Sequence, residues 1–178
     1  MHPDISLILF DEFVIQKRIQ EIGRAISQAT EGKNPILVCI LRGAVVFLAD
    51  LIRVISVPLE IDFMSLSSYG NSTVSSGVVN IRNDITISVQ NRHLIIIEDI
   101  IDSGLTLKFL VEYLVNKKPK SIQTCVLLDK KEARTTDIVL DYVGFEIPNE
   151  FVVGYGLDFG EKYRNLPYIG ILKKEVYI

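Results

Sequence analysis

Acidic and hydroxyl side chains that could do chemistry are concentrated between residues 98 and 106. Glu98 and Asp99 follow an apolar, β-branched run, Asp102 comes three residues later, and Ser-Gly-Leu-Thr completes the stretch. Backbone N–H groups of such a turn, together with the N-terminus of a following helix, bind phosphate groups. Two carboxylates about 5 Å apart repel each other by roughly 3 kcal/mol at an effective dielectric constant of about 20. A phosphate would therefore not lie beside three bare carboxylates.

The conflict is resolved if the carboxylates hold a divalent cation, ribose hydroxyls or a proton that is to be moved. All three needs coincide in a phosphorylated ribose that carries pyrophosphate and Mg²⁺. A simpler alternative is a strand followed by an ordinary helix, with Asp102 or Ser103 as the N-cap. The complete string of residue types favours the phosphate site over this alternative.

The elements that must position this stretch are predicted by hydrophobic periodicity. The run 94–98 is typical of a buried parallel strand, and a helical pattern follows it at 105–117. The other predicted elements are helices at 11–29 and 43–52, strands at 36–41, 59–66, 78–82, 122–128, 138–145, 168–172 and 176–178, and a polar loop at 67–77. Alternating strands and helices predict an α/β fold with a doubly wound, mostly parallel sheet and flanking helices. Ligands of such sheets bind beyond the carboxyl ends of the strands.

Length and composition limit the possible function classes. The chain has 178 residues, 48% hydrophobic and 23% charged, which predicts a single globular domain over residues 1–178. The formal net charge is −3 and the sequence contains no long basic or apolar run, so neither nucleic-acid nor membrane binding is expected. The N-terminus lacks the basic region of a signal peptide. Cys39 and Cys125 lie in apolar, strand-like runs and are expected to be buried free thiols, which indicates a cytoplasmic location.

A second informative stretch runs from Asp141 to Asp158 and is aromatic, interrupted by glycines and poor in charge. By itself it is typical of two buried strands joined by a turn at Pro148 and Asn149. Its position after the acidic stretch is also informative, because the two stretches form an ordered pair of motifs along the chain.

The two stretches together resemble a known enzyme family. Residues 93–106 resemble the phosphoribosyl-pyrophosphate signature of the type I phosphoribosyltransferases. The string VGFEIPNEFVVGYGLD at 143–158 is similar to one found in the 6-oxopurine phosphoribosyltransferases, which act on hypoxanthine and guanine. Further matches are LRG at 41–43, SYG at 68–70, LLDK at 127–130 and YRNLPY at 163–168. The resemblance implies that family's fold, with a small hood region and a mobile flap loop, and transfer of a phosphoribosyl group to a 6-oxopurine base.

Carried over residue by residue, the resemblance implies roles for the acidic side chains. Glu98 and Asp99 would face the ribose hydroxyls and the metal, and Asp158 would bind a second Mg²⁺ ion. Asp102 would be the general base at purine N7. The phosphoribosyl-binding segment would comprise Ile100, Ile101, Asp102, Ser103, Gly104, Leu105 and Thr106, with residues 103–106 at the 5′-phosphate. Mg²⁺ is the implied cofactor.

The resemblance also implies which residues bind the base and the pyrophosphate. Lys130 would contact the purine 6-oxo group, Phe151 would stack on the base, and Val152 would offer backbone hydrogen bonds. Arg164 and the turn formed by Arg42 and Gly43 would bind pyrophosphate. Phosphoribosyl pyrophosphate and a 6-oxopurine are thus the implied partners, and the family's dimers and tetramers imply a homodimer or homotetramer.

The flap is where the sequence departs from the family. Ser68 and Tyr69 would belong to this loop, but residues 72–79, STVSSGVV, differ from the common sequence, which often carries a basic residue there. The departure concerns closure of the loop and substrate affinity rather than reaction type. The family also tends to have a cis peptide bond at the position of Leu41–Arg42.

Purely structural roles remain open for single residues, and other functions remain open for the whole chain. Lys130 could begin a solvated loop, Phe151 could be a core residue and Asp158 a helix N-cap. Arg42 could be a surface cation and Arg164 a solvated helix residue. One functional alternative is a xanthine-preferring 6-oxopurine phosphoribosyltransferase, although those enzymes are usually shorter and lack the FVVGY string. The other is an RNA-binding regulator with this fold, against which the acidic balance of the chain counts.

Overall fold

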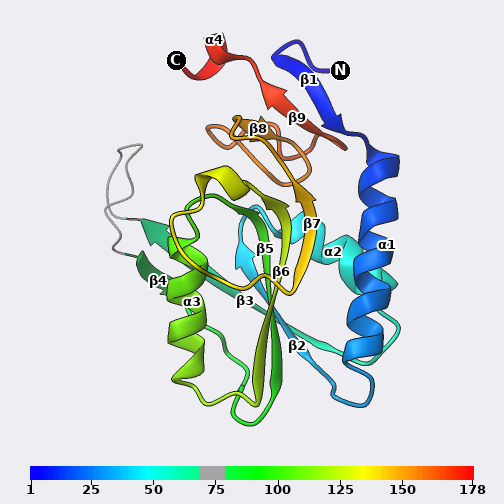
Figure 1. Ribbon diagram of the computed structural model, residues 1–178, viewed down its shortest axis with the longest axis vertical. Coiled ribbons are helices and arrows are strands. Elements are labelled where there is room, and N and C mark those ends of the chain that lie inside the picture. Colours follow the sequence, from blue (N-terminus) through cyan, green and yellow to red (C-terminus); the bar gives the residue numbers. More distant parts are fainter. Residues whose placement is uncertain (69–78) are drawn as a thin grey trace.

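The computed structural model describes residues 1–68 and 79–178 and places them in two sheets with flanking helices (Figure 1). The helices are α1 (Glu12–Ala29), α2 (Val45–Val54), α3 (Leu105–Val115) and the short α4 (Lys174–Tyr177). The strands are β1 (Ile5–Phe10), β2 (Ile36–Leu41), β3 (Glu60–Ser68), β4 (Val79–Asn83), β5 (His93–Ile101), β6 (Ser121–Asp129), β7 (Tyr142–Glu146), β8 (Val152–Val153) and β9 (Ile169–Leu172). A 3₁₀ turn spans Lys131–Ala133. None of the helices described here has the length and apolar character needed to cross a bilayer.

The larger sheet has six strands in the order β4-β3-β2-β5-β6-β7. Its strands are parallel except for the edge strand β4, which pairs antiparallel with β3. The strand that follows β2 in the chain, β3, lies on one side of it, whereas β6 and β7 follow β5 on the other side of the sheet. A reversal of this kind leaves a crevice at the carboxyl ends of the two central strands, where ligands of open α/β sheets bind.

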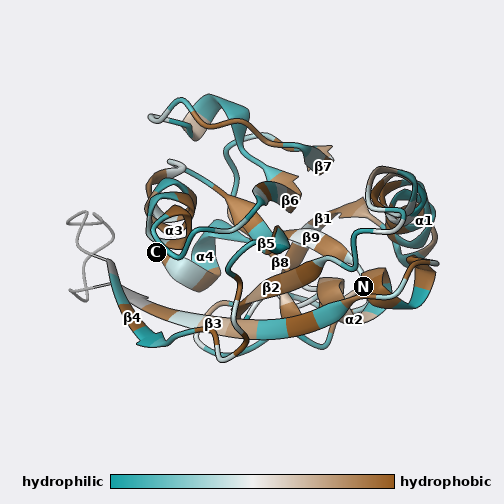
Figure 2. Ribbon diagram, turned by 90° about the horizontal axis from the view of Figure 1, so that it is seen from below, coloured by the Kyte–Doolittle hydropathy of each residue, from teal (hydrophilic) through white to brown (hydrophobic). Residues whose placement is uncertain are grey.

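Both faces of this sheet are covered, because apolar residues occupy successive positions of the central strands. In β2, Leu37 and Cys39 pack in a cluster with α1 and α2, whereas Val38 and Ile40 pack in a cluster with α3. Neighbouring strand residues point to opposite faces, so a continuous apolar run fills two cores at once. Figure 2 shows the hydrophobic central strands β2 and β5 lying between α3 on one side and α1 on the other.

A smaller antiparallel sheet, in the order β1-β9-β8, lies beyond the carboxyl ends of the large sheet (Figure 1). It draws together strands from the beginning and the end of the chain, which pair between Ile5 and Leu172 and between Phe10 and Ile169. This sheet is the small hood that the resemblance implies. It closes one side of the crevice in which the site residues lie.

The predicted fold class is confirmed, and most predicted elements are found within a few residues of their expected bounds. The strand at 36–41 matches β2 at both ends. The strand predicted at 176–178 is wrong, because Lys174–Tyr177 form a helical turn in which the N–H of Ile178 donates to Lys174 O. Residues 138–141 precede β7 rather than belonging to it, and β1 has no counterpart among the predicted elements. Most of the loop predicted at 67–77 lies outside the described residues.

Candidate active site

β5 carries both adjacent acidic residues within its paired length, because the strand continues beyond residue 98 to Ile101. Glu98 stands opposite Val126 of β6, and Ile100 remains paired with the same strand. Since neighbouring residues of a strand point to opposite faces, Glu98 and Asp99 diverge. The two carboxylates therefore lie on different sides of the sheet edge, although the two residues are adjacent in the sequence.

Burial raises the pKa of both carboxyl groups. Burial takes the pKa of Glu98 well above its usual range, and the nearby charge of Asp99 adds to the effect. The pKa of Asp99 is raised by burial to about 6, against the opposing effect of a hydrogen bond from the Ile100 N–H at 2.8 Å. Within the described part of the chain, Oε2 of Glu98 is buried without a hydrogen-bond partner. A carboxylate oxygen in this state fits a site whose cation or donor comes with a ligand.

Asp102 and Lys130 form an ion pair where β5 and β6 end. Lys130 Nζ lies 2.9 Å from Asp102 Oδ1, and the Lys130 side chain is only 11% exposed. The backbone N–H of Lys130 donates to Ile101 O at 3.0 Å, which holds the residue against β5. Lys130 is therefore not the start of a solvated loop. That description fits Lys131, which is 61% exposed and lies near Glu146.

A cavity of about 200 Å³ lies beside this pair, lined by residues from β5, from the end of β6 and from the segment around β8. They are Asp99, Ile100, Asp102, Lys130, Phe151, Val152, Leu157 and Asp158. All except Leu157 are predicted site residues. Phe151 also packs edge-on against Phe159 and stacks on Tyr177, with ring centroids 5.5 Å and 4.9 Å apart. It is thus both a core residue and part of the cavity wall.

The turn between β5 and α3 frames a second cavity, of about 130 Å³. Its lining is Glu98, Ile100, Ile101, Asp102, Ser103, Gly104, Thr106 and Leu107. Gly104 is the N-cap residue of α3 and has a φ of +83°, which glycine adopts without steric cost. A Cβ there would lie 2.2 Å from Thr136 Oγ1. Since neither Asp102 nor Ser103 is the N-cap, the helix-cap alternative is wrong.

Two residues that the sequence does not single out hold this turn in place. The N–H of Thr135 and the hydroxyl of Thr136 both donate to Ser103 O, each at 3.0 Å. They lie in an irregular segment after the 3₁₀ turn, where no periodicity or motif marks them. The geometry of the turn thus depends on a loop that is distant in sequence.

The turn after β2 lies in the site, where its backbone is in close contact with two other segments of the chain. The Leu41–Arg42 peptide is cis, as the resemblance implies. A Cβ on Gly43 would lie 1.5 Å from Asp99 Oδ2, so any larger residue there would force the Asp99 carboxylate to move. Gly156, with a φ of +98°, approaches in the same way, because a Cβ on it would lie 2.2 Å from Gly43 O. Three distant segments meet at the carboxyl edge of the sheet through these contacts.

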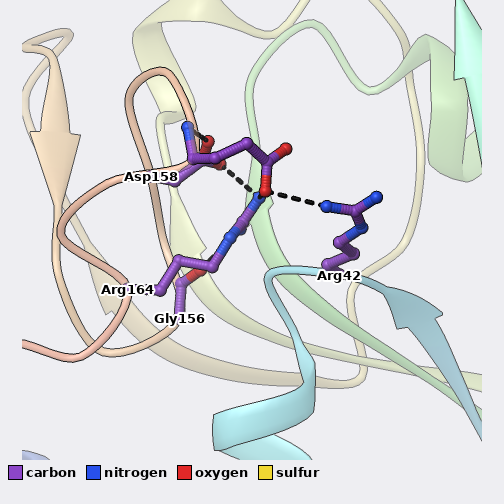
Figure 3. Close-up of polar contacts among 5 residues, drawn as sticks. Arg42, Gly156, Asp158 and Arg164 are labelled. Carbon is purple, nitrogen blue, oxygen red and sulfur yellow. Dashed lines mark hydrogen bonds and ion pairs between the residues drawn. The ribbon is translucent and has the colours of Figure 1, made fainter.

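A second ionic cluster lies on the turn that follows β8 (Figure 3). Arg164 Nη2 lies 2.9 Å from Asp158 Oδ1, and Arg164 Nη1 donates to Gly156 O at 2.8 Å. Glu161 Oε2 accepts from Arg42 Nη1 at 2.8 Å and from Arg164 Nη2 at 3.4 Å. Figure 3 shows the guanidinium groups of Arg42 and Arg164 facing each other, and both donate to this one carboxylate.

The contacts in the ionic cluster test the structural roles considered for Arg164, Asp158 and Arg42. Arg164 is not in a helix and its side chain is only 26% exposed, so it is not a solvated helix residue. Asp158 caps no helix, although its Oδ2 accepts from the N–H of Glu161 at 2.9 Å. Arg42 is indeed a largely exposed cation, at 69%, but one that is held by an acidic partner.

The carboxylates predicted to hold metal are not gathered into one cluster. Among residues 1–68 and 79–178, no three acidic, histidine or cysteine side chains are placed to hold a metal ion together. Asp158 is engaged with Arg164 and with the N–H of Glu161. A cation at this site would need further oxygens from a ligand, which is how Mg²⁺ is commonly held beside phosphates.

The predicted flap residues are only partly described. Ser68 is the last residue of β3, and its backbone pairs with Val79 of β4. Tyr69 lies outside the described residues, together with 70–78.

Comparison with known proteins agrees with this geometry. The phosphoribosyl transferase domain family matches residues 11–160. The hypoxanthine-guanine phosphoribosyltransferase of Bacillus subtilis (strain 168) is 54% identical over 177 residues, which is 99% of this chain and 98% of that protein. The bifunctional protein TilS/HprT of Listeria monocytogenes serotype 4b (strain F2365) is 53% identical over 177 residues, and the chain spans only 27% of its length.

A solved structure supports the same relationship. The hypoxanthine phosphoribosyltransferase of Staphylococcus aureus superposes with a TM-score of 0.96 and 47% sequence identity, over 100% of this chain and 97% of that one. The family match covers most of the chain, and the B. subtilis relative is matched nearly from end to end. The chain therefore belongs to the phosphoribosyltransferase family.

Proposed function

We propose that the chain is a purine-salvage enzyme that transfers the 5-phosphoribosyl group of phosphoribosyl pyrophosphate to N9 of hypoxanthine or guanine. The products are IMP or GMP and pyrophosphate. The observation that carries this proposal is the ion pair of Asp102 and Lys130 beside the 200 Å³ cavity. A purine in that cavity would meet an acceptor and a donor at neighbouring positions of its edge. The name of the B. subtilis relative supports the same activity.

The residues around the cavity have distinct proposed roles at the base. Asp102 accepts the N7 proton while N9 attacks the ribose, since a carboxylate within hydrogen-bond reach can act as the general base. Lys130 donates to the 6-oxo group and discriminates against a 6-amino base, whose amino group would present a donor, not an acceptor, to the ammonium. The ring of Phe151 stacks on the base, and the backbone of Val152 contacts its edge.

The phosphate groups have two proposed binding places. The turn 103–106 at the N-terminus of α3 binds the 5′-phosphate through backbone N–H groups, for which a helix N-terminus is well suited. Arg42 and Arg164 bind the pyrophosphate, because a guanidinium can donate to a phosphate through two parallel hydrogen bonds. Positive groups at that position stabilise the negative charge that develops on the leaving group.

The residues present fit Mg²⁺ as the cofactor. The unpartnered Oε2 of Glu98 and the raised pKa of Asp99 are both features of carboxylates that gain from a nearby cation. We propose that Glu98 and Asp99, from the two sides of the sheet edge, are the residues that would hold Mg²⁺ together with oxygens of the substrate, and that Asp158 would contribute to a second ion. Bound Mg²⁺ would polarise the pyrophosphate and make it a better leaving group.

We further propose that the chain acts as one domain in a homodimer or homotetramer in the cytoplasm. Phe13 and Val14 of α1 and Val45 of α2 are 78%, 40% and 41% exposed, and a second copy would cover them. Cys39 and Cys125 are free and buried, in keeping with a reducing compartment.

A substrate panel tests the proposed reaction. With phosphoribosyl pyrophosphate and Mg²⁺, hypoxanthine and guanine should be converted to IMP and GMP, and adenine should not be converted to AMP. Product formation can be followed by absorbance and confirmed by chromatography. Equal turnover of adenine and hypoxanthine would contradict the proposal, and a clear preference for xanthine would favour the related xanthine enzyme.

Replacing Lys130 tests the proposed contact with the base. Lys130→Ala should raise the KM for hypoxanthine by about tenfold to a hundredfold, because it removes a charged hydrogen bond. Calorimetric binding of phosphoribosyl pyrophosphate should change little. Lys131→Ala is the matched control, since its neighbouring ammonium is exposed. Equal weakening of both substrates by Lys130→Ala would rule out a specific role at the base.

Replacing Asp99 tests whether a buried charge is kept for function at a cost in stability. Burial raises the pKa of Asp99 from 3.8 to about 6, so the folded chain prefers the neutral form. The chain should therefore lose stability as the pH rises from about 4 to about 6, by up to about 3 kcal/mol. Asp99→Asn stays neutral and should avoid this loss.

The measurement is urea unfolding of Asp99→Asn and the parent chain at pH 4.5 and pH 7.5. The variant should gain more stability at pH 7.5 than at pH 4.5, while its Mg²⁺-dependent turnover falls. Asp137→Asn, which removes an exposed carboxylate, is the control. A gain of the same size at both pH values would show that the charge of Asp99 is not the cause.

A further inference from the structure

Glu161 makes a contact that the roles proposed above leave unused. One oxygen of its carboxylate, Oε2, accepts from Arg42 at 2.8 Å and from Arg164 at 3.4 Å. These are the two arginines proposed to bind pyrophosphate, and they come from segments far apart in the chain. A phosphate oxygen of a ligand could accept from the same two guanidinium groups, because guanidinium groups bind phosphate and carboxylate oxygens alike.

The backbone, and not only the reach of the side chain, places this carboxylate. Glu161 has a φ of +64°, which is uncommon for a residue with a Cβ, and Gly160 before it has a φ of +58°. The turn is closed by two backbone hydrogen bonds between Phe159 and Lys162, at 3.3 Å and 3.1 Å. The N–H of Glu161 also donates to Asp158 Oδ2 at 2.9 Å. Left-handed conformations of this kind persist where the surrounding structure enforces them.

We infer that the carboxylate of Glu161 is an internal competitor for the pyrophosphate group at Arg42 and Arg164. The inference rests on the proposed function of these two arginines. Without ligand, Glu161 holds both guanidinium groups in place. Phosphoribosyl pyrophosphate must displace it on binding, and its return helps to expel pyrophosphate after transfer.

The exposure of Arg42 and Glu161 allows a ligand to displace the Glu161 carboxylate at little cost. Arg42 is 69% exposed and Glu161 is 65% exposed, and ion pairs between such exposed groups contribute little to stability. A diphosphate with several charged oxygens can therefore replace a single carboxylate. Arg164 and Asp158, at 26% and 27% exposed, are more deeply placed and can keep their pairing while Glu161 moves away.

The test is Glu161→Gln, which keeps the size of the side chain and removes its charge. The KM for phosphoribosyl pyrophosphate and the inhibition constant of pyrophosphate should both fall, by about twofold to fivefold. The KM for hypoxanthine should not change, whereas a general disturbance of the fold would move it too. Glu21→Gln is the matched control, because Glu21 pairs with Arg18 at 2.7 Å on α1 and its loss changes the net charge equally.

Three results would overturn the inference while leaving the proposed role of Arg42 intact. Weaker binding of pyrophosphate to Glu161→Gln would mean that Glu161 only positions the arginines, and an equal gain in Glu21→Gln would make the effect one of net charge. The third is no gain in Glu161→Gln although Arg42→Gln weakens pyrophosphate binding. Normal pyrophosphate binding to Arg42→Gln would instead refute the proposed role of Arg42, and the inference would fail with it.

Discussion

The site depends on one constraint, the placement of two acidic residues inside a paired and largely buried parallel strand. Glu98 and Asp99 are only partly exposed, and β5 keeps its pairing with β6 up to Ile101. Burial raises the pKa of both groups and leaves Glu98 Oε2 without a partner among the described residues. A ligand can offset such a cost, and the proposed cation with phosphate and ribose oxygens would do so.

The surrounding carboxylates are balanced by cations from other segments. Lys130 at the end of β6 pairs with Asp102, Arg164 pairs with Asp158, and Arg42 beyond β2 pairs with Glu161. The site is therefore held together by ion pairs between elements that are distant in sequence. A substrate that carries both an anionic diphosphate and a base with donors and acceptors can replace these pairs one by one. On the proposed function, the side chains that pair with one another here would also bind the substrate.

Much of this could be predicted from the sequence, because its signals are local. Strand β2 and helix α1 follow from apolar periodicity, and seven of the eight residues that line the 200 Å³ cavity belong to recognisable motifs. Other features depend on contacts between distant segments, which no local pattern encodes. Thr136 supports Ser103 from an irregular loop, and Glu161 meets Arg42 only through folding. The strand predicted at 176–178 is wrong for a related reason, since an apolar run too short for periodicity fits a strand and a helical turn equally well.

The central claim is that Asp102 takes the purine proton, and the steady-state turnover of Asp102→Asn tests it most directly. Asparagine keeps the shape of the side chain but cannot accept the proton as a base. With hypoxanthine and with guanine, kcat should fall by about a hundredfold to ten-thousandfold, the usual contribution of a positioned acid or base. Binding of phosphoribosyl pyrophosphate should stay close to that of the parent chain, because Glu98, Asp99 and the arginines are unchanged. Rates near those of the parent with both bases would contradict the account and would reduce Asp102 to a structural partner of Lys130.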